Sequence, residues 1–132
     1  MGDEVEDGRL RLLERIADAA MQLCCATYGV SIHEMLQKAR ARATAAFARQ
    51  VAMYLAHVVG GLSFGEIAAA FKRDRTTVAH ACHVIEDRRD NLAFDREIER
   101  LETAYRTSVE SLRRKSVESG EAERSAAGGK TR

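Results

Sequence analysis

The sequence contains no proline and only three cysteines in 132 residues. Its composition is rich in alanine, arginine, glutamate and leucine, and nothing in it favours a strand-rich architecture. We therefore expect an all-α fold. The chain also lacks a recognisable signal peptide and any apolar run near the length of a membrane span, so no membrane association is expected. Its length fits one small domain with an appended helix.

The cysteines show no spacing typical of a metal site. Cys24 and Cys25 are adjacent, so on a helix they would point about 100° apart and could not easily pair with each other. The Cys82-His83 pair has no second pair to complete a zinc site. Buried, reduced thiols are the interpretation that remains, and they indicate a cytoplasmic compartment. We expect no cofactor and no metal.

The net charge of +1 argues neither for nor against nucleic-acid binding, but the charge is unevenly distributed. Residues 1–30 carry six acidic and three basic side chains, whereas residues 31–91 carry nine basic and six acidic ones together with all four histidines. Phosphate binding depends on such a local excess of positive charge and not on the net value. The middle of the chain is thus the place to look for an anionic partner.

The most informative stretch runs from residue 63 to residue 85, SFGEIAAAFKRDRTTVAHACHVI. Ser63 and Glu66 have the spacing of a capping box, which starts a helix because each side chain satisfies a free backbone N–H group. Residues 72–74 interrupt the helical periodicity, and Asp74 suits the N-cap of a second helix. A short helix, a tight turn and a second helix predict a helix-turn-helix, whose second helix enters the DNA major groove.

The expected second helix has two different faces. Its apolar face consists of Val78, Ala81, Cys82 and Ile85, and the opposite side carries Thr76, His80, His83 and Asp87, with Thr77 on the flank. Polar residues at the N-terminal end of such a helix are placed to contact base edges. The alternative is a surface helix pair whose polar face is merely solvated.

Three further helical segments are expected upstream of this motif. A helix over about residues 9–28 ends at Gly29, and a short helix follows from a second capping box, Ser31 with Glu34. The basic segment 37–50 then leads into a helix over about residues 44–59. Four cations without an acid in that segment suit phosphate contact or a narrow minor groove, although solvated arginines at a helix start would give the same pattern.

The two ends of the chain differ from its middle. Residues 1–8 are acidic and expected to be frayed, and residues 118–132 are predicted to form a disordered tail. Between them, segment 92–117 predicts a long C-terminal helix over about residues 94–117, with an apolar stripe of Ile98, Leu101, Tyr105 and Leu112 that Ser108 interrupts. This stripe could pair with a second copy to form a homodimer or fold back onto the first helix.

Two segments resemble the C-terminal DNA-binding domain of the bacterial replication initiator DnaA. They are ARQVAMYLAHVVGGLSFGEIAAAF, residues 48–71, and RDRTTVAHACHVIED, residues 73–87. The similarity covers roughly residues 10–91, more loosely over the opening helix pair, and we expect residues 9–91 to form the DNA-binding domain. In that family the helix-turn-helix enters the major groove of double-stranded DNA, and an arginine of a basic loop enters the adjacent minor groove.

The resemblance implies a set of DNA-contacting residues in this sequence. Those expected in the major groove are Asp74, Arg75, Thr76, Thr77 and His80, and those expected at the minor groove or phosphates are Lys38, Arg40, Arg42, Arg49, Lys72 and Arg73. The minor-groove arginine itself is either Arg49, at the family's Arg-Gln position, or one of Arg40 and Arg42. Chemically, a carboxylate can accept from cytosine, a threonine methyl can contact thymine and histidine can donate to a purine.

The chain also departs from the family pattern. Arg75 stands where the family has histidine, the turn FKRD is one residue shorter than Phe-Gly-Gly-Arg-Asp, and no proline precedes Arg49. No P-loop motif is present, so the resemblance implies a stand-alone relative without the initiator's ATPase module. The scattered histidines have no paired nucleophile or acid, which argues against an enzyme.

The sequence thus predicts a sequence-specific DNA-binding regulator of transcription or replication, located in the cytoplasm with the nucleoid. The alternative is a helical interaction module in which the C-terminal helix binds a partner and the helix-turn-helix is vestigial.

Overall fold

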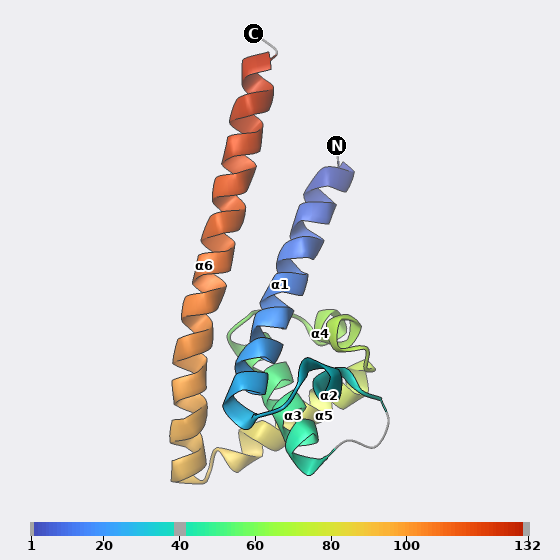
Figure 1. The fold of residues 1–132 in the computed structure, drawn as a ribbon, viewed down its shortest axis with the longest axis vertical. Coiled ribbons are helices and arrows are strands. Elements are labelled where there is room, and N and C mark those ends of the chain that lie inside the picture. The colour runs from blue at the N-terminus through green and yellow to red at the C-terminus, as the bar shows by residue number, and fades with distance from the viewer. Residues whose placement is uncertain (1, 39–41, 131–132) are drawn as a thin grey trace.

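A computed structural model describes the backbone of residues 2–38 and 42–130, and the side chains of residues 4–38 and 42–120. All regular secondary structure in these ranges is α-helical, which confirms the predicted fold class (Figure 1). The helices are α1 (Gly2–Tyr28), α2 (Ile32–Leu36), α3 (Ala43–Val58), α4 (Phe64–Phe71), α5 (Arg75–Arg88) and α6 (Leu92–Lys130).

Both terminal helices are longer than the sequence pattern indicates. Helix α1 begins at Gly2, so the backbone is helical from there through the segment 1–8 that we expected to be frayed. Helix α6 continues past residue 117 to Lys130, where the composition predicted disorder. No proline interrupts either segment, and alanine, glutamate and arginine, which recur in them, are among the strongest helix formers. Residues 1, 131 and 132 lie outside the described backbone.

The end of α1 and the start of α2 follow local sequence signals. Gly29 adopts a left-handed conformation with a φ of 66°, which closes α1 after Tyr28 as predicted. Ser31 caps α2, and its Oγ accepts a hydrogen bond from the Glu34 backbone N–H at 3.1 Å. The predicted helix starts and stops in this part of the chain are therefore confirmed.

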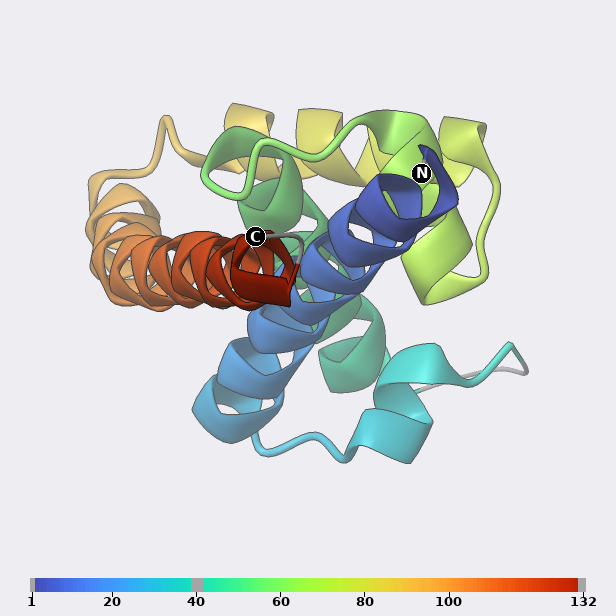
Figure 2. The same ribbon diagram turned by 90° about the horizontal axis from the view of Figure 1, so that it is seen from above.

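Helix α3 is the centre of the molecule and contacts each of the other helices. Most of its side chains are small or aliphatic, and the buried ones are Ala45, Ala48, Val51, Ala52, Met53, Tyr54, Leu55 and Ala56. A helix that is apolar on all sides must be covered on all sides, because each exposed face would leave apolar area in water. The helix-turn-helix therefore packs on one side of α3 and the pair of terminal helices on another (Figure 2).

Helix α6 runs antiparallel to α1 and packs against it (Figure 1). Ile98 and Tyr105 are fully buried, and the Tyr105 hydroxyl donates a 2.6 Å hydrogen bond to the Ile16 carbonyl of α1. Val109, 4% exposed, continues the stripe across the predicted break at Ser108. The structure thus shows the fold-back arrangement. Of the side chains suggested for a homodimer, Ile98, Leu101 and Tyr105 are buried within one chain and Leu112 is partly buried.

Gly60 lies just after α3, at a point where α1 and α6 leave no room for a side chain. A Cβ at this position would lie 2.5 Å from the Ala56 carbonyl oxygen and 2.8 Å from the Tyr105 hydroxyl oxygen. Only glycine avoids these contacts without moving the backbone. Arg113 of α6 also donates to the Gly60 carbonyl at 2.9 Å, so the turn after α3 and the C-terminal helix hold each other in place.

The C-terminal end of α5 is attached to α6 and α3 by two adjacent arginines. The Arg88 guanidinium carbon lies 4.7 Å from the ring centre of Phe47 and 4.8 Å from that of Phe94. Arg89 donates to Asp95 at 2.6 Å and pairs with Glu102 at 3.1 Å. Helix α6 thereby fixes the end of α5 that lies away from the helix-turn-helix turn.

None of the helices within the described ranges combines the length and the apolar character that a membrane span requires.

Candidate nucleic-acid interface

The helix-turn-helix begins with the predicted capping box of α4. The Ser63 Oγ accepts from the Glu66 backbone N–H at 3.1 Å, and the Ser63 backbone N–H donates to Glu66 Oε1 at 2.8 Å. Ile67 and Phe71 are fully buried, so α4 is anchored to the core through its apolar stripe. The first helix of the motif is consequently fixed at its start and along one side.

The turn between α4 and α5 is short and contains one unusual backbone conformation. Lys72 is left-handed, with φ of 56° and ψ of 45°, and is the only non-glycine residue with positive φ in the described part of the chain. The Arg73 backbone N–H donates to the Ala68 carbonyl at 2.9 Å and completes the end of α4. A left-handed conformation costs a residue with a Cβ about 1 kcal/mol, a cost that glycine would not incur.

Asp74 is the N-cap of α5, as predicted. Its Oδ1 accepts a hydrogen bond from the Thr77 backbone N–H at 2.8 Å. This backbone hydrogen bond, together with a bond from the Thr77 side chain, lowers the pKa of Asp74 below its usual value. Because the pKa is lowered in the folded state, the cap stabilises the protein above the ordinary carboxyl pKa, and that stability is lost as the pH falls through the lowered value.

Helix α5 has the two faces that the sequence predicts. Val78 and Ile85 are fully buried, while Ala81 and Cys82 are 2% and 8% exposed. Arg75, Thr76, Thr77 and His80 are all exposed, and they lie in the first turns of the helix directly after the cap. A guanidinium, two hydroxyls with their methyl groups and an imidazole thus face outward together, and these groups can contact base edges.

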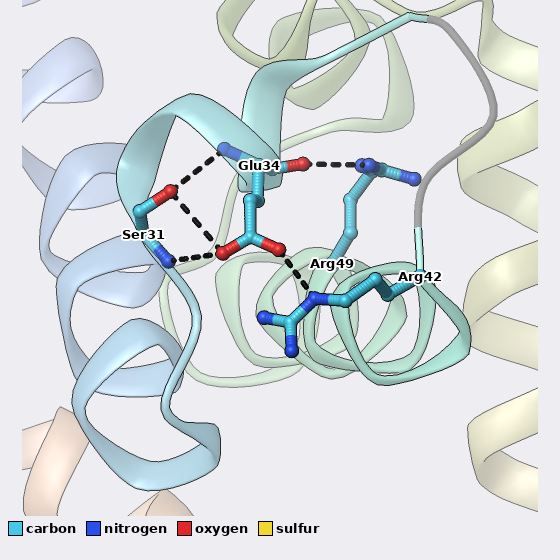
Figure 3. A network of polar contacts seen from close by, with 4 residues as sticks. All are labelled: Ser31, Glu34, Arg42 and Arg49. Atoms are coloured by element: carbon cyan, nitrogen blue, oxygen red, sulfur yellow. Dashed lines mark hydrogen bonds and ion pairs between the residues drawn. The ribbon is translucent and has the colours of Figure 1, made fainter.

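Arg49 lies in a different place from the other predicted basic residues. Its side chain turns inward from α3 and donates to the carbonyls at the end of α2 (Figure 3). The Nε group lies 2.6 Å from the Met35 oxygen, and one terminal nitrogen lies 3.1 Å from the Glu34 oxygen and 3.4 Å from the Gln37 oxygen. Arg49 therefore satisfies carbonyl groups that a helix end leaves without partners.

Glu34 holds the other side of the same short helix. Its Oε1 accepts from the Ser31 backbone N–H at 3.3 Å, and its Oε2 lies 2.6 Å from the Arg42 Nε (Figure 3). The bond to Arg42 and the bond from Ser31 lower the pKa of Glu34. The two arginines thus join α2 to α3, one through backbone oxygens and one through a carboxylate.

Arg73 connects the turn of the helix-turn-helix with the basic loop, which is the part of the basic segment 37–50 that precedes α3. One of its terminal nitrogens lies 2.5 Å from the Gln37 carbonyl oxygen, to which Arg49 also donates. Burial and the nearby positive charge of Arg73 together lower the pKa of Arg49. The segments that carry the major-groove and loop candidates are therefore neighbours, joined at a single backbone oxygen.

Not every predicted contact residue is held inside this network. Lys38 and Lys72 are exposed and outside it, Arg42 is exposed but pairs with Glu34, and Arg49 and Arg73 are partly buried. Arg40 falls in segment 39–41, which is outside the described residues. The sequence pattern did not indicate that Gln37 would join two segments, because its contribution is a carbonyl oxygen that every residue carries.

Within the described ranges, no group of histidine, cysteine and acidic side chains is arranged to hold a metal ion. Burial, the largest cause, raises the pKa of Cys24 to about 12 and that of Cys82 to about 11. These two thiols are therefore protonated near neutral pH and poor nucleophiles.

The fold and the exposed first turns of α5 define a helix-turn-helix protein. The family described as "Bacterial dnaA protein helix-turn-helix" matches residues 17–85, more than half of the chain, and the chain belongs to this family.

The relatives of this chain are bacterial replication initiators. It is 36% identical over 83 residues to the chromosomal replication initiator protein DnaA of Pseudothermotoga lettingae, covering 61% of this chain and 18% of the relative. It is 46% identical over 65 residues to the same protein of Methylobacillus flagellatus, covering 48% of this chain and 14% of the relative. The chain thus spans less than a fifth of the curated relatives that it matches.

Two solved structures share the fold. A DNA replication initiation factor superposes with a TM-score of 0.67 and 30% identity, over 81% of this chain and 32% of that one. A replication initiator DnaA bound to AMPPCP and single-stranded DNA superposes with a TM-score of 0.62 and 32% identity, over 71% and 30% of the two chains. The likeness thus covers about a third of each of the two solved chains.

Proposed function

We propose that this protein binds double-stranded DNA in a sequence-specific manner and regulates transcription or replication. The observation that carries the proposal is the outward-facing group of Arg75, Thr76, Thr77 and His80 at the capped start of a helix-turn-helix second helix. That placement fits the geometry in which the first turns of such a helix contact base edges in the major groove. Membership of the initiator helix-turn-helix family supports DNA as the partner.

Asp74 can offer a base only part of its carboxylate. Its Oδ1 is engaged by the Thr77 backbone N–H, so base contact falls to the second carboxylate oxygen. We therefore assign Asp74 two tasks, capping α5 and accepting a hydrogen bond from a base such as cytosine. Arg75 is the most versatile member of the group, because a guanidinium can donate two parallel hydrogen bonds to guanine.

The basic loop would approach the adjacent minor groove or the phosphates. Lys38 and Arg42 are exposed and therefore accessible to DNA, and Lys72 and Arg73 extend the positive surface from the turn. We assign Arg49 to positioning, because its hydrogen bonds to the end of α2 orient the loop from within. Of the two alternatives for the minor-groove arginine, the loop residues are thus favoured over Arg49, and Arg40 remains a candidate by its position in the sequence.

The proposed role requires no enzymatic activity. The match to the initiator family lies in its helix-turn-helix, so DNA binding without ATP hydrolysis is the activity that we assign. A protein of this kind would act in the cytoplasm at the nucleoid, either at promoters or in competition with an initiator for its boxes.

Selection from a library of randomised duplexes tests the proposal. We expect repeated selection to enrich one short asymmetric motif, and binding to that duplex to exceed binding to a scrambled duplex and to either single strand. Recovery of random sequences after several rounds, with equal affinity for all duplexes, would contradict sequence-specific binding. Tighter binding to the single strand than to its duplex would contradict the assignment of double-stranded DNA.

A further inference from the structure

Helices α2 and α4 lie on the side of α1 that faces away from α6 (Figure 2). Residues of α1, α2 and α4 line a groove there. It consists of two adjoining hollows of about 360 Å³ each, which share Glu14 of α1 and Ala69 and Ala70 of α4 as lining residues. On α1 the lining extends from Arg9 to Met21, which corresponds to about 18 Å along the helix. The groove is therefore long enough for about three turns of another helix.

The floor of the groove is apolar and partly open to solvent. Leu10 of α1 is 53% exposed and Ile32 of α2 is 39% exposed, two of the few large hydrophobic side chains that the described surface leaves uncovered. Apart from Glu66, the α4 wall consists of the small residues Gly65, Ala69 and Ala70. Small side chains on a helix allow a second helix to approach closely and bury the neighbouring leucines.

The charged residues of the groove are mostly of one sign. Glu14 and Asp18 lie one turn apart on α1, both are exposed, and neither forms an ion pair with another described residue. Glu66 also lines the groove, but it pairs with Arg9 at 3.6 Å, the one basic residue of the lining. The uncompensated charge is thus negative, and it borders an apolar floor. This combination complements a helix with an apolar face and flanking basic side chains.

We propose that this groove binds an amphipathic helix with a basic flank, supplied by a partner protein. None of the side chains assigned to base contact lines either hollow, although a Cβ built at the lining residue Gly65 would lie 3.7 Å from the Arg75 Nε. DNA and the partner would therefore occupy adjoining surfaces. Helix α4 is at once a wall of the groove and the first helix of the helix-turn-helix. A bound partner would therefore contact α4, against which α5 packs, and leave the exposed face of α5 uncovered. This proposal does not depend on which DNA sequence is bound.

The test uses three synthetic peptides of about 14 residues, the length that fills the groove with a small margin. One places leucines at i, i+3, i+4 and i+7 with lysines elsewhere, one replaces every lysine by glutamate, and one scrambles the lysine peptide so that no apolar face remains. Fluorescence anisotropy with the full chain measures each affinity. We expect the lysine peptide to bind at least about tenfold more tightly than the other two.

Variants locate the bound peptide. Glu14→Lys combined with Asp18→Lys should reverse the preference toward the glutamate peptide, and Leu10→Asp should weaken binding of the lysine peptide by about tenfold. A matched control, Glu99→Lys combined with Glu110→Lys on the exposed side of α6, should leave the preference unchanged. Because Leu10, Glu14 and Asp18 are exposed, the thermal melting and DNA affinity of the groove variants should stay at wild-type values.

Several outcomes would overturn the proposal. One is equal binding of the scrambled peptide, and another is an unchanged preference after the double charge reversal. A third is sedimentation of the wild-type protein as a dimer that Leu10→Asp converts to a monomer, since the occupant would then be a second copy. If a groove variant fails to fold, amide chemical shifts of the wild-type protein decide the question. The lysine peptide must then shift residues of α1, α2 and α4, and shifts confined to α5 or α6 would contradict the site.

Discussion

The two ends of α5 carry the same kind of residue in opposite surroundings. At the N-terminal end, Arg75 is exposed and forms no ion pair with another described residue. At the C-terminal end, Arg89 is bound to Asp95, Glu102 and the Tyr54 hydroxyl, and its side chain is only 18% exposed. One arginine is available to a ligand and the other fixes the helix. The contacts that each arginine makes, and not the residue type, thus distinguish the anchored end of α5 from the end that we propose to bind DNA.

The anchored end should give the largest effect on stability. Arg89→Ala leaves Asp95 and Glu102 without their cation, so we expect the free energy of unfolding to fall by about 2–3 kcal/mol. Arg96→Ala, an exposed arginine on α6, is the control and should change it by less than about 0.5 kcal/mol. Urea titration followed by circular dichroism measures both. A wild-type midpoint for Arg89→Ala would show that this network does not hold α5.

Substitutions at the N-terminal end of α5 should weaken DNA binding and leave stability unchanged. Thr76→Ala, Thr77→Ala and His80→Ala should each weaken binding to the selected duplex by about 1–3 kcal/mol, since each removes one base contact. Unfolding midpoints and binding to random DNA should change little, as they should for the control Thr107→Ala on α6. Anisotropy titrations with both duplexes measure the difference. Equal losses on both would mean that these side chains do not distinguish bases.

The basic segment also contains one arginine that we expect to stabilise the fold and one lysine that we expect to contact DNA, with smaller effects. Arg49→Ala should lower the free energy of unfolding by about 1–2 kcal/mol, because three carbonyls lose a charged donor. Lys38→Ala should leave stability unchanged and lower the slope of log K against log salt by about 0.9, the value for one phosphate contact. If Arg49→Ala instead changes the salt slope and not the stability, Arg49 contacts DNA directly.

Substitution of Lys72, in the turn between α4 and α5, should have the smallest effect on stability. Lys72→Gly should stabilise the protein by about 1 kcal/mol, because glycine adopts the left-handed conformation without cost. Lys72→Ala retains the Cβ and should bring no such gain, although both variants remove the same charge. Thermal melting separates the conformational effect from the electrostatic one. Equal melting temperatures for the two variants would contradict strain at Lys72.

The sequence predicted best what depends on neighbours in the chain. The capping boxes at Ser31 and Ser63 and the N-cap at Asp74 involve residues three positions apart, so their chemistry can be read from the order of residues alone. The buried face from Val78 to Ile85 follows from helical periodicity in the same way. The motif that carries the proposed function could therefore be located without a structure.

Tertiary contacts explain what the sequence did not indicate. Arg49 reads as a basic residue of a DNA-binding segment, but α3 places it beside carbonyls from residues 34–37 that only folding brings near. The stripe on α6 was compatible with a second copy or with α1, and the choice depends on the shape of the α1 surface around Ile16. In both cases the residue pattern indicates what kind of side chain is present, but not which part of the folded chain it contacts.

Arg75 provides the most direct test of the central claim that the exposed start of α5 reads bases. Site selection from randomised duplexes should be carried out in parallel with the wild-type protein and with Arg75→His. We predict that the wild-type motif contains a guanine at one position and that the variant loses this preference there, while the remaining positions stay the same. Identical motifs for the two proteins would contradict the claim.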